Sequence, residues 1–141
     1  MTLPSPVYPN FSHLPGGLRG ETYEATIDMS SAAASFDIFT RPANSVIAAI
    51  AVKVPNTLTA ATAVKFGIGN ASDPDAYYRS AGLTTASSTY QVLLHADTNI
   101  TSTEALKVYA VDTNGAAAGT IGGGADDYLQ VRITYFVVEG F

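Results

Sequence analysis

The sequence predicts an all-β fold, an antiparallel β-sandwich of the jelly-roll type that carries an extended N-terminal arm. The clearest support comes from Tyr128–Val138, where apolar and polar side chains alternate, as they do in a strand that buries one face. Several shorter segments, separated by Gly, Pro, Asn and Asp, repeat this organisation. No long stretch shows the 3.6-residue repeat of an amphipathic helix, so a helical bundle or a βαβ fold is not expected.

The length of the chain predicts one domain. With 141 residues, the chain can bury roughly 70% of the surface that it exposes when unfolded. It therefore needs no disulfide bonds for stability, and it contains no cysteine. We expect residues 22–141 to form a single β-sandwich domain and residues 1–21 to form the arm.

The arm, residues 1–21, differs in composition from the rest of the chain. It holds four of the seven prolines together with three glycines, a composition that favours extended backbone with few internal hydrogen bonds. It also holds Val7, Tyr8 and Phe11, apolar side chains that a fully solvated tail does not need. Two interpretations stay open: a solvated terminus, and an arm that places these three side chains against a neighbouring subunit.

The expected strands follow one another from Thr22 onward. Each is a short run with alternating or mainly apolar residues, and the segments between them are rich in turn-forming or small residues. In chain order, the expected strands are Thr22–Met29, Phe36–Thr40, Ser45–Val54, Ala63–Gly69, Thr89–His95, Glu104–Val111 and Tyr128–Val138.

The segment Ser45–Val54 is unusual because both of its faces are apolar. Strict alternation puts Ile47, Ala49 and Ala51 on one face, and on the other Val46, Ala48, Ile50, Val52 and Val54. Such a strand is either central in the fold or covered by another subunit. Because small alanines allow close approach, Ile47, Ala49 and Ala51 are candidates for a subunit contact. A wholly internal explanation is the alternative.

The stretch Asn70–Thr89 is the longest expected loop, and long loops in compact domains often carry function. Asp73 and Pro74 suit the start of a helix, and Gly82 suits its end, so a helix of one or two turns is expected here. Its aspartates are then helix caps rather than a calcium site or a catalytic carboxylate pair.

Tyr77 and Tyr78 lie within the same stretch. Exposed tyrosines can stack on sugar rings, but tyrosine is also a common half-buried strand residue and a common anchor of protein interfaces. Both interpretations stay open, and Tyr77 and Tyr78 are candidates for an interface.

Other short motifs are expected to be structural. Asp112–Gly115 resembles the start of a calcium loop but lacks the glutamate at the twelfth position, and Asn-Gly between strands favours a turn. Gly122–Gly124 lacks the Lys-Ser/Thr of a phosphate-binding loop, and Gly67–Gly69 lacks the third glycine of a dinucleotide fingerprint. Asp126–Asp127 is expected to be a solvated start of the last strand rather than a metal pair.

No residue pattern assigns a catalytic activity, and the protein is not expected to be an enzyme. A Ser–His–Asp site needs an activated nucleophile, but no Gly-x-Ser-x-Gly elbow accompanies His13 or His95. No motif for a cofactor or a metal ion occurs, so neither is expected.

Charge and hydropathy limit the partners. The net charge is −5 and the seven basic residues are scattered, which argues against nucleic acid. No apolar run is long enough to span a membrane, and no secretory signal is visible. Only 13% of the residues are charged. This is few for the surface of a free monomer, and it indicates that much of the surface contacts other protein.

Part of the chain resembles small virion proteins of tailed bacteriophages. The resemblance rests on an Ala/Val-rich strand, a Leu-Thr-Ala segment, a Gly-containing strand, an Asp-Pro-Asp-aromatic loop and a closing strand with Arg132 and Tyr135. In this sequence these are Ser45–Val54, Leu58–Thr62, Lys65–Gly69, Asp73–Tyr78 and Leu129–Val138. The group includes head decoration (cement) proteins and components of tails or fibres, typically β-sandwiches that assemble as trimers or other symmetric oligomers.

The resemblance implies a structural virion protein, most directly a cement protein that stabilises the head by bridging capsomers. Its expected partners are the major capsid protein and copies of itself, as a homotrimer. Its expected location is the capsid exterior, after synthesis in the cytoplasm of the bacterial host. The alternative is a binding module of a tail fibre or spike, whose loops at Asn70–Thr89 and Asp112–Asp127 would contact glycans of the host surface.

Overall fold

The computed structural model describes residues 18–59, 65–80, 90–94 and 100–138. This described part contains eight strands and no helix. Seven of the strands lie where the sequence predicts them, β7 and β8 with the predicted bounds, whereas β5 was not expected. The strands are β1 (Leu18–Asp28), β2 (Ser35–Arg41), β3 (Ser45–Lys53), β4 (Lys65–Gly69), β5 (Tyr78–Arg79), β6 (Gln91–Leu94), β7 (Glu104–Val111) and β8 (Tyr128–Val138).

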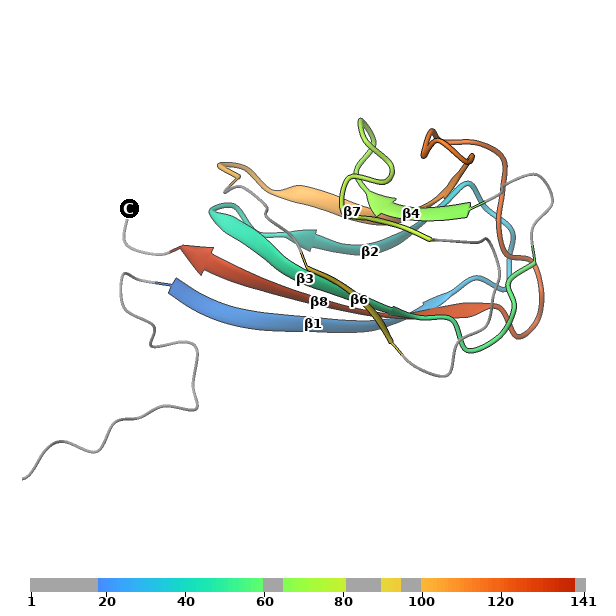
Figure 1. Ribbon diagram of the computed structural model, residues 1–141, viewed down its shortest axis with the longest axis horizontal. Coiled ribbons are helices and arrows are strands. Elements are labelled where there is room, and N and C mark those ends of the chain that lie inside the picture. The colour runs from blue at the N-terminus through green and yellow to red at the C-terminus, as the bar shows by residue number, and fades with distance from the viewer. Residues whose placement is uncertain (1–17, 60–64, 81–89, 95–99, 139–141) are drawn as a thin grey trace, which may run out of the picture.

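The strands form two four-stranded antiparallel sheets that lie face to face (Figure 1). Sheet 1 has the order β1-β8-β3-β6, and sheet 2 has the order β2-β7-β4-β5. The ladders pair β1 with β8, β2 with β7, β3 with β6 and β4 with β5. The second half of the chain therefore runs back along the first, which is the nested pairing of a jelly roll. The predicted fold class is confirmed.

A single apolar core fills the space between the sheets. The alternation in β8 is confirmed, because the residues of its predicted core face are each at most 8% exposed: Leu129, Val131, Ile133, Tyr135 and Val137. Sheet 2 contributes residues that are 0–1% exposed, among them Phe66, Ile68, Leu106 and Val108. Each fully buried aliphatic side chain of this kind stabilises the fold by about 1.5–3 kcal/mol.

Strand β1 begins at Leu18, four residues before the predicted start at Thr22. Its register with β8 is unbroken from Leu18 opposite Val138 to Asp28 opposite Tyr128. The residues before Thr22 include Gly20 and show little alternation, so local periodicity did not indicate this end of the strand. Residues 1–17 lie outside the described residues.

Strand β3 contains a β-bulge that changes which residues face the core. Ile47 lies opposite Tyr135 and Ala49 lies opposite Thr134, so Ala48 is the extra residue. Because of the bulge, Ile47 and Ile50 both point into the core and are both 0% exposed. The strict alternation that the sequence predicts for this strand is therefore wrong.

The helix expected after Asp73 is absent from residues 70–80, and that prediction is wrong. The backbone forms a turn instead: the Ala76 N–H donates to the Asp73 carbonyl at 3.2 Å, and Asn70 Oδ1 accepts from the Asp73 N–H at 2.8 Å. The Tyr77 N–H then donates to the Ile68 carbonyl at 2.9 Å. The Tyr77 N–H, which a helix would need for its own hydrogen bonds, is therefore used to pair with β4. Strand β5 begins at the next residue, Tyr78.

The glycines of β4 allow this turn to fold down on the strand. A Cβ at Gly67 would lie 2.8 Å from the carbonyl oxygen of Pro74, and a Cβ at Gly69 would collide with the carbonyl oxygen of Asp73. Both glycines are therefore required by close backbone approach, which confirms their predicted structural role.

Candidate interaction surface

The outer face of sheet 1, called the outer face below, consists of side chains that point away from the core. Its β1 and β8 rows are mainly Thr, Gln and charged residues, and its β3 row is apolar except for Lys53 at the end of the strand. The β1 and β8 rows contain Thr22, Glu24, Thr26, Gln130, Arg132, Thr134 and Phe136.

The β3 row of the outer face consists of Val46, Ala49, Ala51 and Lys53, which lie opposite Phe136, Thr134, Arg132 and Gln130 of β8. Of the residues predicted for a subunit contact, Ala49 lies half-buried on this face. Ala51 lies on the same face but is only 8% exposed, so its assignment to a contact surface is corrected. Ile47 does not lie on this face, because the bulge turns it into the core; its assignment to a contact surface is corrected.

Arg132 occupies the middle of the outer face. Its Nε lies 2.6 Å from Glu24 Oε1 on β1, and its guanidinium carbon lies 4.6 Å from the centre of the Tyr90 ring. Because both charged side chains are largely exposed, at 43% and 62%, the ion pair stabilises the fold by no more than about 1 kcal/mol. Its main effect is to orient Arg132 between the two partners.

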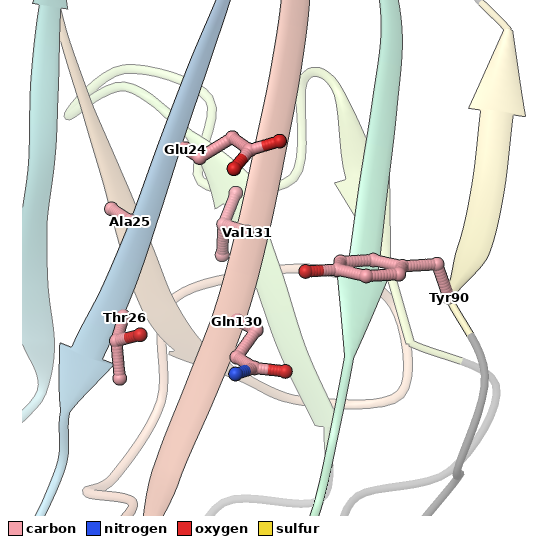
Figure 2. A pocket seen from close by; sticks show the side chains of 6 residues that line it. All are labelled: Glu24, Ala25, Thr26, Tyr90, Gln130 and Val131. Atoms are coloured by element: carbon pink, nitrogen blue, oxygen red, sulfur yellow. The ribbon is translucent and has the colours of Figure 1, made fainter.

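A pocket of about 190 Å³ lies on the same face, lined by Glu24, Ala25, Thr26, Tyr90, Gln130 and Val131. Figure 2 shows the Tyr90 ring lying across β3, with its hydroxyl directed towards β8. Ligand sites commonly measure about 300–1,000 Å³. This pocket is smaller, so we do not interpret it as a site for a small molecule.

Tyr135 lies near the end of β8, and the pKa of its hydroxyl is raised. The hydroxyl donates to Glu21 Oε2 at 2.7 Å. Burial raises the pKa of Tyr135 to about 12, and the hydrogen bond to Glu21 and its negative charge act in the same direction. The ring belongs to an aromatic group in which Phe39 lies 5.7 Å from Tyr135 and 4.5 Å from Tyr23, measured between centroids. The group fixes this end of the sandwich.

Arg41 is fully buried and holds together a polar network at the ends of β2 and β7. Its Nη1 donates to the Tyr77 hydroxyl at 2.9 Å and to Glu104 Oε1 at 3.2 Å, and its Nη2 donates to the Ser45 carbonyl at 2.9 Å. The Asn70 amide donates to Glu104 Oε2 at 2.7 Å. Sequence reasoning missed this network; its only local signal was an arginine at the end of an apolar strand.

The two tyrosines predicted for an interface are engaged inside the protein. Tyr78 is 7% exposed and its ring centroid lies 5.6 Å from that of Phe66, so its assignment to a contact surface is corrected. Tyr77 is half-buried, with its ring beneath the Arg41 guanidinium and its hydroxyl donating to Glu104. The third set of predicted contact residues, Val7, Tyr8 and Phe11, lies outside the described residues.

Asp73 and Asp75 act within the turn. Desolvation raises the pKa of Asp73, as do a hydrogen bond to Asp75 and its charge. Asp75 also forms an ion pair with Arg79 at 3.4 Å, and its carboxylate fills the space where Gly115 would carry a Cβ. Nothing in this geometry places the two carboxylates across an open cleft, as acid–base chemistry on a sugar would need.

Asp127 is buried rather than solvated, which corrects the expectation for the start of β8. At 5% exposure, its Oδ2 accepts hydrogen bonds from the backbone N–H groups of Thr59 at 2.9 Å and Gly124 at 3.1 Å. The Asp112–Gly115 turn is confirmed by the Gly115 N–H, which donates to the Asp112 carbonyl at 3.1 Å.

Within the described ranges, no cluster of three or more His, Cys, Asp or Glu side chains could hold a metal ion. The same residues contain no helix that is long and apolar enough to cross a membrane.

Comparisons with known proteins reveal similarity at the level of the fold. The sequence matches no protein-family model and no curated protein. Its structure is similar to a chain of the cyanophage Pam1 capsid asymmetric unit, with a TM-score of 0.52, 16% identity, and coverage of 97% of this chain and 94% of that chain. It is also similar to a chain of the acid-stable capsid of Helicobacter pylori bacteriophage KHP30, with a TM-score of 0.52, 11% identity, and coverage of 86% and 94%. At these identities the likeness shows a shared fold.

Proposed function

We propose that this protein is a structural component of a bacteriophage virion. The observation that carries the proposal is the match of nearly the whole jelly roll to a chain of a phage capsid, over 97% of this chain and 94% of that chain. A chain of a second phage capsid is also covered over 94% of its length. Both matches therefore extend over nearly the whole of a phage capsid chain.

Within that class, we propose a decoration or cement protein that binds the exterior of the capsid and bridges neighbouring copies of the major capsid protein. The low proportion of charged residues, 13%, and the mixed outer face, whose β3 row is apolar from Val46 to Ala51, support a surface that contacts protein. A protein that binds the assembled shell but not its free subunits stabilises the shell by mass action. This role needs no catalytic group.

The glycan-binding alternative has lost part of its support. It relied on Tyr77 and Tyr78 as stacking platforms, but Tyr78 is 7% exposed and the Tyr77 hydroxyl is bonded to Glu104. Of the described tyrosines, Tyr90 lines the pocket on the outer face and is a remaining candidate for contact with a sugar. The similarity to phage capsid chains favours the structural role, which is the function that we propose.

The test is reconstitution with capsids of the source phage from which this protein has been removed. We expect saturable binding at symmetric positions in cryo-electron microscopy, together with a higher melting temperature of the shells. Density confined to the tail, or no binding, would contradict the cement role.

A pair of variants locates the contact in the same assay. Ala49→Arg places a charge in the β3 row of the outer face, whereas Ala105→Arg places the same charge at an exposed position of β7 in sheet 2. If the outer face binds the shell, Ala49→Arg lowers occupancy and Ala105→Arg does not. Equal occupancy of the capsid by both variants would exclude the outer face as the surface that binds the shell.

A further inference from the structure

The four edge strands of the two sheets differ in how well they could pair with another chain. The edges are β1 and β6 in sheet 1 and β2 and β5 in sheet 2. β5 has two residues and β6 has four, and the β2 ladder is interrupted between Asp37 and Phe39. Short edges and bulges are the usual devices that prevent pairing between molecules. Among the described strands, three of the four edges are therefore protected.

β1 lacks these devices. It is eleven residues long, contains neither Pro nor Lys, and its register with β8 has no irregularity. On its other side, its backbone ladder includes none of the described strands. Its contacts with β2 involve side chains: the Tyr23 ring stacks on Phe39, and the Tyr23 hydroxyl donates to the Ile38 carbonyl at 3.0 Å.

We propose that this edge of β1 pairs antiparallel with β1 of a second copy, so that the two copies of sheet 1 form one continuous sheet across a twofold axis. Backbone hydrogen bonds would supply the affinity, as in other cases of strand addition. The inference goes beyond the proposed function, because it names one contact surface and its partner.

The side chains of β1 fit one register of this pairing. The register that pairs the whole strand places Tyr23 opposite the partner's Tyr23 and Thr22 opposite the partner's Glu24. It also places Glu21 opposite the partner's Ala25, so no two like charges stand directly opposite each other. Like charges in that position would destabilise the pair.

The neighbouring registers are less favourable for pairing. A shift of two residues in one direction places Glu24 opposite the partner's Glu24, and a shift in the other direction shortens the ladder. In the favoured register the two Glu24 side chains are diagonal neighbours, and each is already held by its own Arg132 at 2.6 Å. The arginines offset the repulsion between these carboxylates.

Two substitutions at Thr22 test the register. Thr22 is exposed, so both variants should retain the fold, which the melting temperature of each checks. Thr22→Glu would face the partner's Glu24 twice per dimer, whereas Thr22→Lys would face the same carboxylates with opposite charge. The full-length protein and both variants are compared by analytical ultracentrifugation over a range of concentrations at low salt.

We expect the unmodified protein to form a dimer, with a dissociation constant that rises at least about tenfold in Thr22→Glu and is unchanged or lower in Thr22→Lys. A monomer at all concentrations would overturn the proposal, as would an equal effect of the two substitutions. A mass of three copies would also overturn it, because a threefold-symmetric trimer, the oligomer implied by the phage resemblance, uses a heterologous contact rather than a self-complementary one.

This measurement is separate from the capsid assay. A dimer that ignores the shells would contradict the proposed function and support the β1 contact. A monomer that binds the shells would support the proposed function and contradict the β1 contact.

Discussion

Arg41 and Glu104 are cross-strand partners in the β2–β7 ladder, and their side chains form an ion pair at 3.2 Å. The guanidinium is 0% exposed and the carboxylate is 17% exposed. Because Tyr77, Asn70 and Ser45 supply the remaining hydrogen bonds, the charges are satisfied by the protein rather than by water. The pair ties the ends of two strands to the turn between β4 and β5.

Replacing Arg41 with Met should therefore destabilise the protein strongly. Removal of one partner leaves Glu104 partly buried without its countercharge, which costs about 3 kcal/mol for pairs of this kind. Urea unfolding followed by circular dichroism measures the loss. The control is Arg79→Met, which removes an ion pair whose arginine is 42% exposed and should cost less than about 1 kcal/mol. Equal urea midpoints for the two variants would show that the buried Arg41 network contributes no more to stability than the exposed ion pair of Arg79.

The bulge in β3 predicts a contrast between two adjacent residues. Ile47 is 0% exposed, whereas Val46 lies on the outer face opposite Phe136. Ile47→Ala should lower the free energy of unfolding by about 2–5 kcal/mol, as for other large-to-small changes in a core. Val46→Ala should cost much less. A larger effect at Val46 would mean that the strand follows strict alternation and that the bulge is absent.

Gly122 and Gly123 test the packing of the segment before β8. Both have positive φ, +91° and +104°, but a Cβ at Gly122 would collide with the Met29 carbonyl oxygen, whereas a Cβ at Gly123 would only touch the Ala32 methyl at 3.4 Å. Alanine at Gly123 should cost about 1–2 kcal/mol through backbone strain alone. We expect Gly122→Ala to cost clearly more. Thermal melts of both variants give the comparison, and similar losses would argue against the collision.

The raised pKa of Tyr135 predicts a loss of stability in alkaline solution. The folded state holds the phenol proton up to a pKa of about 12, compared with about 10 when the chain is unfolded. This contribution is fully present below pH 10 and disappears as the pH rises from about 10 to 12. Tyr135→Phe should flatten the stability profile in that range.

Absorbance at 295 nm checks the same assignment directly, because it follows tyrosinate formation. When the titration curve of Tyr135→Phe is subtracted from that of the unmodified protein, the difference should correspond to one phenol that ionises near pH 12. If the phenol that is missing in the variant instead ionises near pH 10, the proposed effect of burial and of Glu21 on its pKa is contradicted.

Removal of residues 1–17 tests the arm. If Val7, Tyr8 and Phe11 contact a neighbouring subunit, a chain that begins at Leu18 should retain its melting temperature but show reduced occupancy on capsids. The control is a deletion of residues 1–20, which also removes the first three residues of β1 and should lower stability. Full occupancy without residues 1–17 would assign the capsid contact to the folded domain.

Alternating or mainly apolar runs between turn-forming segments were enough to locate seven strands. Where the residues alternate, period two records which side of the strand faces the core. It also located the outer face through Thr134 and Arg132 of β8. Alternation failed in β3, since every residue from Val46 to Val52 is apolar and an extra residue in the register leaves no trace in such a run. It also failed at Asp73–Pro74–Asp75, because the same residue types cap helices and form turns.

By itself, then, the sequence determined the fold class, most of the strands and the core face of β8, all of which follow from local periodicity. Only the tertiary structure decided that Arg41 meets Tyr77 and Glu104, which are 36 and 63 residues away in the chain. It also decided that Ile47 and Tyr78 are buried and that β1 has a long, regular edge. These features depend on which strands become neighbours, and strand order is set by packing between distant segments rather than by the residues of any one strand.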